Sequence, residues 1–230
     1  MLHAFGVTKT IIFDLDDTLY DCSGTLIHSM RLKVAGVIAS AIGCSEKEAY
    51  ELQLKKETTL NGNLYEDIAQ HYSLPPSFLE DIKKALSEVS INEIRPFEGV
   101  VDVLKYLKNK GLVLYLVTAG IREEQEGKIH VLGLDGMFDE IIILQAVSSE
   151  AKKACFKEIL DKHDLKPEEV LCVGDRMDRE LKVAKELGIP TVMVKHGRHY
   201  QRFVSGSKGG EKPDIYIESV ADLPSVLPVK

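Results

Sequence analysis

Short apolar runs alternate with longer segments of helical period along most of this chain, and this alternation constrains the fold more than any other feature. The runs that read as strands lie at residues 10–13, 112–117, 140–144, 170–173, 191–194 and 214–217. The segments that read as helices lie at residues 101–109, 123–132, 151–163 and 179–187, each ending near a glycine or a Lys-Pro pair. Apolar strands separated by helices of about ten to fifteen residues are typical of a parallel sheet covered on both faces. We therefore predict a doubly wound α/β fold.

The alternation stops between the first two predicted strands. Residues 21–95 show helical periodicity without a clear strand, and turn-forming residues interrupt them at Gly43, Asn61-Gly62 and Pro75-Pro76. We expect a core made of residues 1–20 and 96–230 and a small helical cap at 21–95. The hinge between them should lie near residues 20–23 and 92–96.

Charge and composition exclude several classes of protein. The 230 residues carry 29 basic and 36 acidic side chains, a net charge of −7, whereas nucleic-acid binders usually have a basic excess. The short basic segment at 195–199 with Arg202 is interpreted as a solvated loop, and residues 205–213 as a mobile one.

No apolar run reaches the roughly 18 residues of a membrane span, and the first ten residues do not resemble a signal peptide. The four cysteines are widely spaced, so we expect reduced thiols in a cytoplasmic protein.

The chemistry gathers at the ends of the predicted strands. Ligands of open α/β sheets bind outside the carboxyl ends of the strands, so the residues that follow each strand should meet. These residues are Asp14-Leu15-Asp16-Asp17-Thr18, Thr118-Ala119-Gly120, Lys152-Lys153 and Gly174-Asp175 with Asp178. Asp14 and Asp16 can point into one cleft, where their mutual repulsion requires a cation such as Mg²⁺. The alternative is that the acids only cap the helices that follow them. Capping would explain a single aspartate, but it explains less well why charged residues follow four successive strands.

These residues resemble the motifs of the haloacid dehalogenase (HAD) superfamily. Asp14 to Thr18 is similar to its phosphatase-type D-x-D-x-T motif, Thr118 to its second motif, and Asp175 with Asp178 and Glu180 to its acidic fourth motif. The insert is similar to the small helical cap of the first subclass. The resemblance covers the whole chain and implies a Rossmann-like core.

The third motif of the superfamily supplies a lysine, and its position here is less plain. The more common spacing, counted back from Asp175, reaches Glu150, whereas a shorter spacing of 23 residues reaches Lys152 with Phe156 behind it. We take Lys152 as the motif lysine and Lys153 as the alternative. Ala119 and Glu180 depart from the asparagine and aspartate that relatives often have at these positions.

The resemblance implies a Mg²⁺-dependent phosphatase. Asp14 would be the nucleophile that forms an aspartyl-phosphate, and Asp16 the general acid and then the general base. Mg²⁺ would be held by Asp14, the backbone carbonyl of Asp16, and Asp175. The phosphoryl group would be held by Thr118, Lys152 and the amides of Leu15, Ala119 and Gly120, while Thr18 would stabilise the loop. Asp178 and Glu180 would orient the waters of the metal or Lys152, or would simply begin a helix.

The substrate is expected to be a small phosphate monoester, either a sugar phosphate or a nucleoside monophosphate. Residues 16–20 and 50–64 weakly resemble pyrimidine 5′-nucleotidase-type members, although Thr58-Thr59 reads equally well as a helix cap. His28 and Arg31 read as exposed-face residues, with contact to the leaving group as the alternative. His196 and His199 have no other ligand near them in sequence, and a helix through Gly197 is not expected.

Four other functions stay open. A phosphomutase uses the same acids, whereas a dehalogenase needs no proton donor at Asp16 and is therefore less favoured. A phospho-acceptor receiver domain carries its acceptor on the third strand and has no such insert. A noncatalytic binding protein on this fold would be expected to have lost one of the acids. We expect a monomer or homodimer that does not bind nucleic acid or membranes.

Overall fold

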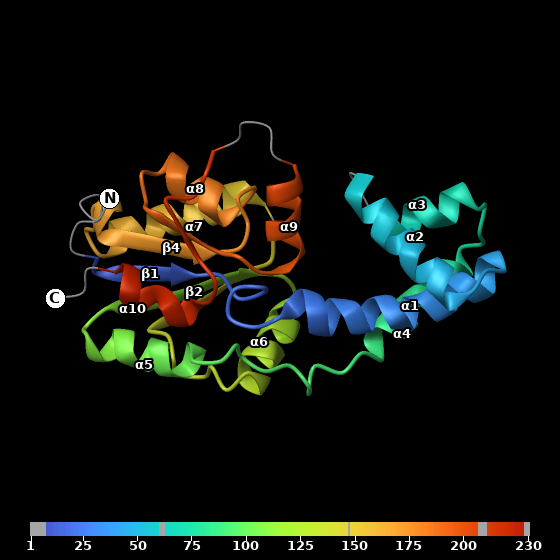
Figure 1. The fold of residues 1–230 in the computed structure, drawn as a ribbon, viewed down its shortest axis with the longest axis horizontal. Helices are drawn as coiled ribbons and strands as arrows, with labels where there is room; N and C mark the ends of the chain where they lie inside the picture. Colours follow the sequence, from blue (N-terminus) through green and yellow to red (C-terminus); the bar gives the residue numbers. More distant parts are fainter. Residues whose placement is uncertain (1–7, 60–62, 147, 207–210, 228–230) are drawn as a thin grey trace. The chain divides into compact units, whose positions relative to one another are not determined.

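The computed structural model describes residues 8–59, 63–146, 148–206 and 211–227 (Figure 1). By its internal contacts the chain divides into two compact units, Met1–Ser23 with Ile94–Lys230, and Gly24–Glu93. We call these the α/β unit and the helical unit and describe each by itself. The assignment of residues 21–95 as a catalytic cap stays a prediction.

The α/β unit is built on one parallel sheet of six strands in the order β3-β2-β1-β4-β5-β6. The strands are β1 (Thr10–Phe13), β2 (Val113–Ala119), β3 (Glu140–Leu144), β4 (Val170–Gly174), β5 (Thr191–Val194) and β6 (Ile215–Ile217). Phe13, the last residue of β1, pairs with Leu116 of β2 on one side and Val173 of β4 on the other. The predicted doubly wound sheet is confirmed. Its order reverses between β1 and β4, the place where such sheets bind ligands.

Helices cover both faces of this sheet (Figure 1). They are α5 (Val100–Asn109), α6 (Arg122–Val131), α7 (Ser149–Lys162), α8 (Glu180–Glu186), α9 (Gly197–Ser205) and α10 (Leu223–Val226), with 3₁₀ turns at Pro167–Glu169 and Val220–Asp222. Figure 1 shows α7 and α8 on one face and α5 and α10 on the other. All four residues of β1 are buried, which is why its sequence is a continuous apolar run rather than an alternating one.

One expected loop is a helix. The basic segment at 195–199 with Arg202 is expected to be a solvated loop, but residues from Gly197 onward form α9; residues 195–200 are half-buried, and Arg202 is exposed as expected. Gly197 has a φ of +76° and starts the helix instead of interrupting it. Tyr200 and Phe203 pack against the hydrophobic core of the sheet. This packing explains why the segment forms a helix. The expected mobile loop at 205–213 lies partly outside the described residues.

The helical unit contains α1 (Ile27–Ile42), α2 (Glu46–Thr59), α3 (Leu64–His71) and α4 (Ser77–Ser87), preceded by a π-helical turn at Cys22–Leu26. Its core is formed by Val34, Ala35, Ile38, Ala39, Ala49, Ile68, Phe78 and Ile82. Gly43 ends α1 with a φ of +73°, as its sequence predicts. The expected break at Asn61-Gly62 lies outside the described residues.

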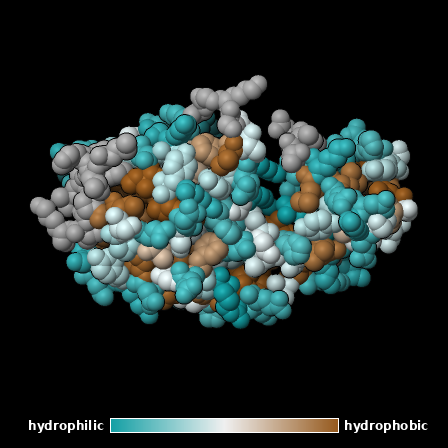
Figure 2. All heavy atoms as spheres, viewed as in Figure 1, coloured by the Kyte–Doolittle hydropathy of each residue, from teal (hydrophilic) through white to brown (hydrophobic). Residues whose placement is uncertain are grey.

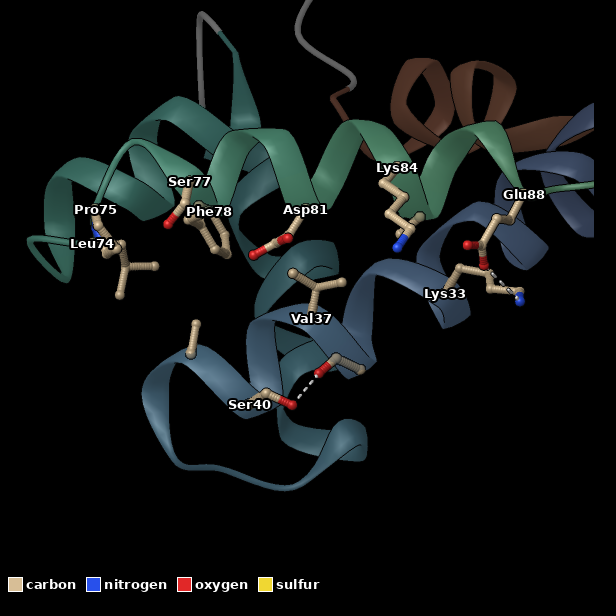
Figure 3. Close-up of a pocket in the computed structure, with 13 residues that line it drawn as sticks. Lys33, Val37, Ser40, Leu74, Pro75, Ser77, Phe78, Asp81, Lys84 and Glu88 are labelled. Atoms are coloured by element: carbon tan, nitrogen blue, oxygen red, sulfur yellow. Dashed lines mark hydrogen bonds and ion pairs between the residues drawn. The ribbon is translucent and has the colours of Figure 1, made fainter.

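The first long helix of this unit is apolar as well as long. The helical stretch Cys22–Ile42 has a mean hydropathy of 1.2 and is the one described helix that is long and apolar enough to cross a membrane, by length and composition alone. Its most apolar part is 28% buried, and Val34, Ala35, Ile38 and Ala39 lie in the core of the helical unit. A groove of about 650 Å³ lies between α1 and α4, with Val37 and Phe78 on its walls and Lys33 and Glu88 paired at one end (Figure 3). Hydrophilic residues predominate on the face of both units drawn in Figure 2.

Candidate active site

Asp14 lies directly after strand β1 and contacts a lysine of helix α7. Its backbone N–H donates to the Val173 carbonyl at 3.0 Å, which extends the sheet by one residue and fixes where the side chain begins. Lys152, in the first turn of α7, donates from Nζ to Asp14 Oδ1 at 2.7 Å and to Glu180 Oε2 at 2.9 Å. Lys153 instead pairs with Glu186 at the surface. The structure thus brings Lys152, and not Lys153, to the aspartate.

Glu180, the first residue of α8, is held from two sides. One carboxylate oxygen accepts from Lys152, and the other accepts from the Arg176 N–H at 2.8 Å. Gly174 at the end of β4 makes this approach possible, because an added Cβ would lie 2.7 Å from the Glu180 side chain. The end of β4 therefore fixes the carboxylate that shares Lys152 with Asp14.

Asp175 is the least satisfied side chain of the site. It is 1% exposed, and neither carboxylate oxygen has a hydrogen-bond partner among the residues that the structure describes. Oxygens of Asp14, Asp175 and Glu180 lie within 4.8 Å of one another. A buried carboxylate without partners is costly, and three carboxylates share one ammonium group here. Hard divalent cations prefer carboxylate oxygens, so these residues fit such an ion.

The protonation of this cluster reflects its burial. Burial raises the pKa of Asp14 to about 6, against the opposing charge of Lys152. The pKa of Asp175 lies well above its usual range, first because of burial and then because of the charges of Glu180 and Asp14. Burial disfavours the ammonium form of Lys152, yet the charges of Asp14 and Glu180 hold its pKa above the usual range.

Asp16 has a separate set of partners. Lys128 of α6 donates from Nζ to both of its carboxylate oxygens, at 3.0 and 3.2 Å, and the Tyr20 hydroxyl donates to Oδ1 at 2.5 Å. Burial alone would raise the pKa of Asp16, but Lys128 and Tyr20 together hold it below its usual value. Neither partner was predicted from the sequence. The signal for Lys128 was its spacing of three residues from Gln125 on the predicted helix, which places both on one face; both are buried.

The loop that carries Asp16 is closed by Asp17, for which no role was predicted from the sequence. Asp17 has a φ of +57°, and its carboxylate accepts from the Ser23 N–H at 2.7 Å and the Ser23 hydroxyl at 2.5 Å. A Cβ on Gly197 would overlap the Asp17 carboxylate, so only glycine fits there. The Leu15 carbonyl accepts from the Thr18 N–H at 3.3 Å, whereas the buried Thr18 hydroxyl has no partner in the described part of the chain.

Thr118, Ala119 and Gly120, the predicted phosphate-binding residues of the second motif, lie at the end of β2, which pairs with β1. Thr118 is 2% exposed near the end of β2. The Gly120 N–H donates to the Leu144 carbonyl at 2.9 Å, so this amide is already used within the sheet. The Ala119 carbonyl accepts from the Gln125 side chain at 3.2 Å.

Asp178 does not join the other acids. Its side chain is 68% exposed and pairs with Arg176 at 2.8 Å. Its expected role in orienting the metal or Lys152 therefore has no contact to support it, whereas Glu180 does contact Lys152.

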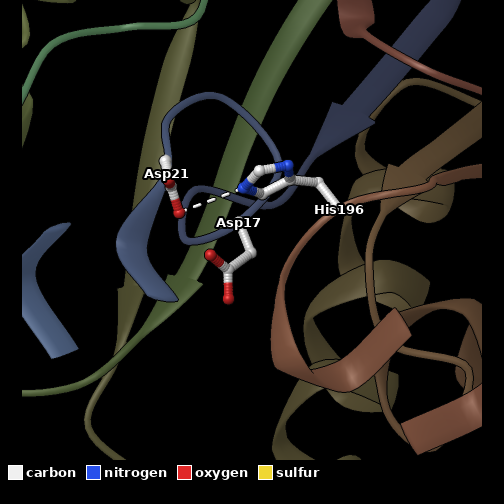
Figure 4. Close-up of side chains that lie close together, drawn as sticks. All are labelled: Asp17, Asp21 and His196. Atoms are coloured by element: carbon white, nitrogen blue, oxygen red, sulfur yellow. Dashed lines mark ion pairs between the residues drawn. The ribbon is translucent and has the colours of Figure 1, made fainter. Parts of the chain in front are cut away.

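The two histidines near the basic segment lie in different surroundings. His196 pairs with Asp21 at 3.0 Å, and both lie beside Asp17, so that the three side chains offer ligand atoms within 4.8 Å of one another (Figure 4). Both Asp17 oxygens already accept from Ser23, which accounts for the position of that carboxylate. Burial and the nearby charges of arginines lower the pKa of His199 to about 3.

In the helical unit, Arg31 is not the exposed residue that was expected. It is 7% exposed and pairs with Glu57 at 2.7 Å. His28 is exposed and contacts the Tyr50 hydroxyl at 2.9 Å. Of the stretch at 50–64, residues 60–62 and the side chains of Thr58 and Thr59 lie outside the described part of the structure.

Comparison with known proteins leads to the same chemistry. Residues 11–194 match the family described as haloacid dehalogenase-like hydrolase. A glyceraldehyde 3-phosphate phosphatase of Methanocaldococcus jannaschii is 28% identical over 225 residues, which are 95% of this chain and 96% of that protein. The pyrophosphatase PpaX of Halalkalibacterium halodurans is 28% identical, covering 96% and 98%. The crystal structure of a HAD phosphatase from Thermococcus onnurineus, 21% identical, shares the fold with a TM-score of 0.65 over 97% and 99% of the two chains.

Proposed function

The chain belongs to the haloacid dehalogenase-like hydrolases, and we propose that it is a Mg²⁺-dependent phosphatase that hydrolyses a small sugar phosphate through an aspartyl-phosphate. The observation that carries this proposal is the pairing of the buried Asp14 with Lys152 beside the unpartnered carboxylate of Asp175. A nucleophile, a cation for the transferring group and a site for a second cation are thus adjacent.

The first half of the reaction is the transfer of the phosphoryl group to Asp14. A carboxylate oxygen of Asp14 attacks phosphorus, and the bond between phosphorus and the substrate oxygen breaks. For this step Asp16 must be protonated when substrate is bound, although Lys128 and Tyr20 hold its pKa low in the free protein; the leaving alkoxide takes this proton, so that an alcohol departs and Asp16 becomes a carboxylate. Lys152 offsets charge on the transferring oxygens, and Thr118 and the amides of Leu15 and Ala119 donate to them.

The second half is hydrolysis of the intermediate. Asp16 now takes a proton from water, which attacks the phosphorus of the aspartyl-phosphate. The bond from phosphorus to Asp14 breaks, inorganic phosphate leaves, and both aspartates return to their starting states. The exposure of the Asp16 side chain, 32% against 11% for Asp14, supports its role as the group that exchanges protons with substrate and water.

The metal would be held by the carboxylates of Asp14 and Asp175 and by the backbone carbonyl of Asp16. Mg²⁺ bound there supplies positive charge to the transferring phosphoryl group. Glu180 is already engaged by Lys152 and Arg176, so we assign it to holding the lysine rather than the metal.

The substrate class rests on the relatives. The protein of Methanocaldococcus jannaschii, similar over nearly its whole length, is named for glyceraldehyde 3-phosphate, and this supports a short sugar phosphate. We place the enzyme in the cytoplasm as a monomer or homodimer acting on a small molecule.

Release of inorganic phosphate tests the proposal. Wild type and Asp14→Asn are compared on glyceraldehyde 3-phosphate, longer sugar phosphates, nucleoside monophosphates and pyrophosphate, with Mg²⁺ and with EDTA. We expect activity that requires Mg²⁺, is absent from the variant and is greatest on a sugar phosphate. Full activity of Asp14→Asn would overturn the mechanism, and a preference for nucleotides or pyrophosphate would overturn the substrate class.

A further inference from the structure

We propose that Lys128 is a positioning residue for Asp16 that fixes its carboxylate for proton transfer to the leaving group. This inference rests on the proposed phosphatase function and adds a residue to it. The two residues lie 112 positions apart in the sequence, and α6 brings the lysine to the end of β1.

The contact is of a kind that fixes orientation. Lys128 Nζ bridges both carboxylate oxygens of Asp16, and the Tyr20 hydroxyl adds a third hydrogen bond at Oδ1. A single hydrogen bond leaves a carboxylate free to turn about its last torsion angle, whereas a bridge to both oxygens restrains it. The donors come from α6 and from the loop after β1, so Asp16 is held between two parts of the α/β unit.

Burial distinguishes this pair from ordinary surface ion pairs. The Lys128 side chain is 10% exposed, whereas the lysine of the surface pair Lys162–Glu140 is 53% exposed. A buried ammonium is costly unless it is paired, and among the described residues Asp16 is the one carboxylate with which Lys128 forms an ion pair. The ion pair with Asp16, the candidate general acid, therefore offsets the cost of burying the Lys128 ammonium group.

Position matters for this role because a general acid must lie within hydrogen-bond reach of the oxygen that it protonates. A misplacement of about 1 Å can lower a rate about 10²-fold. The effect depends on the leaving group. An alkyl oxygen leaves slowly without a proton, whereas a nitrophenolate leaves without one.

The test uses this dependence. We would measure kcat/KM, which reports the steps up to formation of the aspartyl-phosphate, for glyceraldehyde 3-phosphate and for p-nitrophenyl phosphate. For Lys128→Met we expect a loss of about 10²-fold on the alkyl ester and of less than about 5-fold on the aryl ester. Lys128→Arg should recover most of the loss, and the matched surface change Lys162→Met should leave both substrates unaffected.

Tyr20→Phe provides a second, milder variant that removes only the hydroxyl donor. It should show the same selectivity for the alkyl ester with a smaller loss, and it serves alone if Lys128→Met does not fold by circular dichroism. Equal losses on both esters, or none on either, would overturn the role of Lys128 while leaving the phosphatase proposal intact. If the wild type hydrolysed neither ester, or if Asp14→Asn stayed active, the proposed function and this inference would fail together.

Discussion

The two aspartates after β1 are separated by one residue, yet their surroundings are opposite. Around Asp14 three carboxylates share the single ammonium of Lys152, whereas Asp16 has Lys128 to itself and a phenol hydroxyl besides. Burial raises the pKa of Asp14 to about 6 despite the charge of Lys152, whereas Lys128 and Tyr20 lower the pKa of Asp16 against the effect of burial. Two residues of the same type therefore differ through their surroundings: the buried Asp14 cluster has more carboxylates than ammonium groups and fits a cation, whereas Asp16 is already paired.

The largest effect should come from removing the nucleophile. Asp14→Asn keeps the shape of the side chain but has no carboxylate with which to attack phosphorus, so we expect kcat to fall by about 10⁴-fold or more. Phosphate release measures this, and circular dichroism checks that the fold is kept. If instead Asp16→Asn removed all activity and Asp14→Asn did not, the roles assigned to the two aspartates would be reversed.

The lysine of the Asp14 cluster should come next in effect. Lys152→Met removes the cation beside Asp14 and Glu180, and we expect kcat to fall by about 10²- to 10³-fold. Lys153→Met is the matched control, because it removes a neighbouring surface lysine that pairs only with Glu186 among the described residues. A comparable loss in both variants would show that the pairing of Lys152 with Asp14 is not what matters for catalysis.

Much of this arrangement could be predicted from the sequence. The central strands β1, β4 and β5 are buried along their whole length, so each is a compact apolar run, and an aspartate follows β1 and β4 at their carboxyl ends. The resemblance to the superfamily's third motif implied Lys152, and Lys152 lies at Asp14 in the structure.

The rest required the packed structure. Lys128 lies on a helix whose rotation about its axis the sequence leaves open, and its partner is 112 residues away. A loop was predicted at 195–199 with Arg202, and no helix through Gly197, but the packing of the partly buried Tyr200 and Phe203 on the core outweighs that tendency. The sequence likewise does not show that Glu180 contacts Lys152 while Asp178, two residues before it, is exposed and pairs with Arg176.

A smaller effect, on stability rather than rate, should distinguish repulsion among the carboxylates in the metal-free protein from the stabilisation that Mg²⁺ provides. Asp175→Asn removes one of the three carboxylates, so the metal-free protein should become more stable while Mg²⁺ binding weakens. We therefore expect the Tm without metal to rise by a few degrees and the increase in Tm on adding Mg²⁺ to shrink. Differential scanning fluorimetry measures both, and an unchanged response to Mg²⁺ would exclude Asp175 as a ligand.

The smallest effect is the dependence of this response on pH. In the metal-free protein the pKa of Asp14 is raised to about 6, so its contribution to stability is present below the ordinary value near 3.8 and is lost as pH rises through 6. Asp175, whose pKa is also raised, acts in the same direction. Mg²⁺ must displace these protons, so the increase in Tm that it causes should be small at pH 5 and larger at pH 7.5. Lys128→Met, which alters only the balanced cluster around Asp16, should keep this trend. A response to Mg²⁺ that falls with rising pH would contradict the assignment of the metal to the Asp14 cluster.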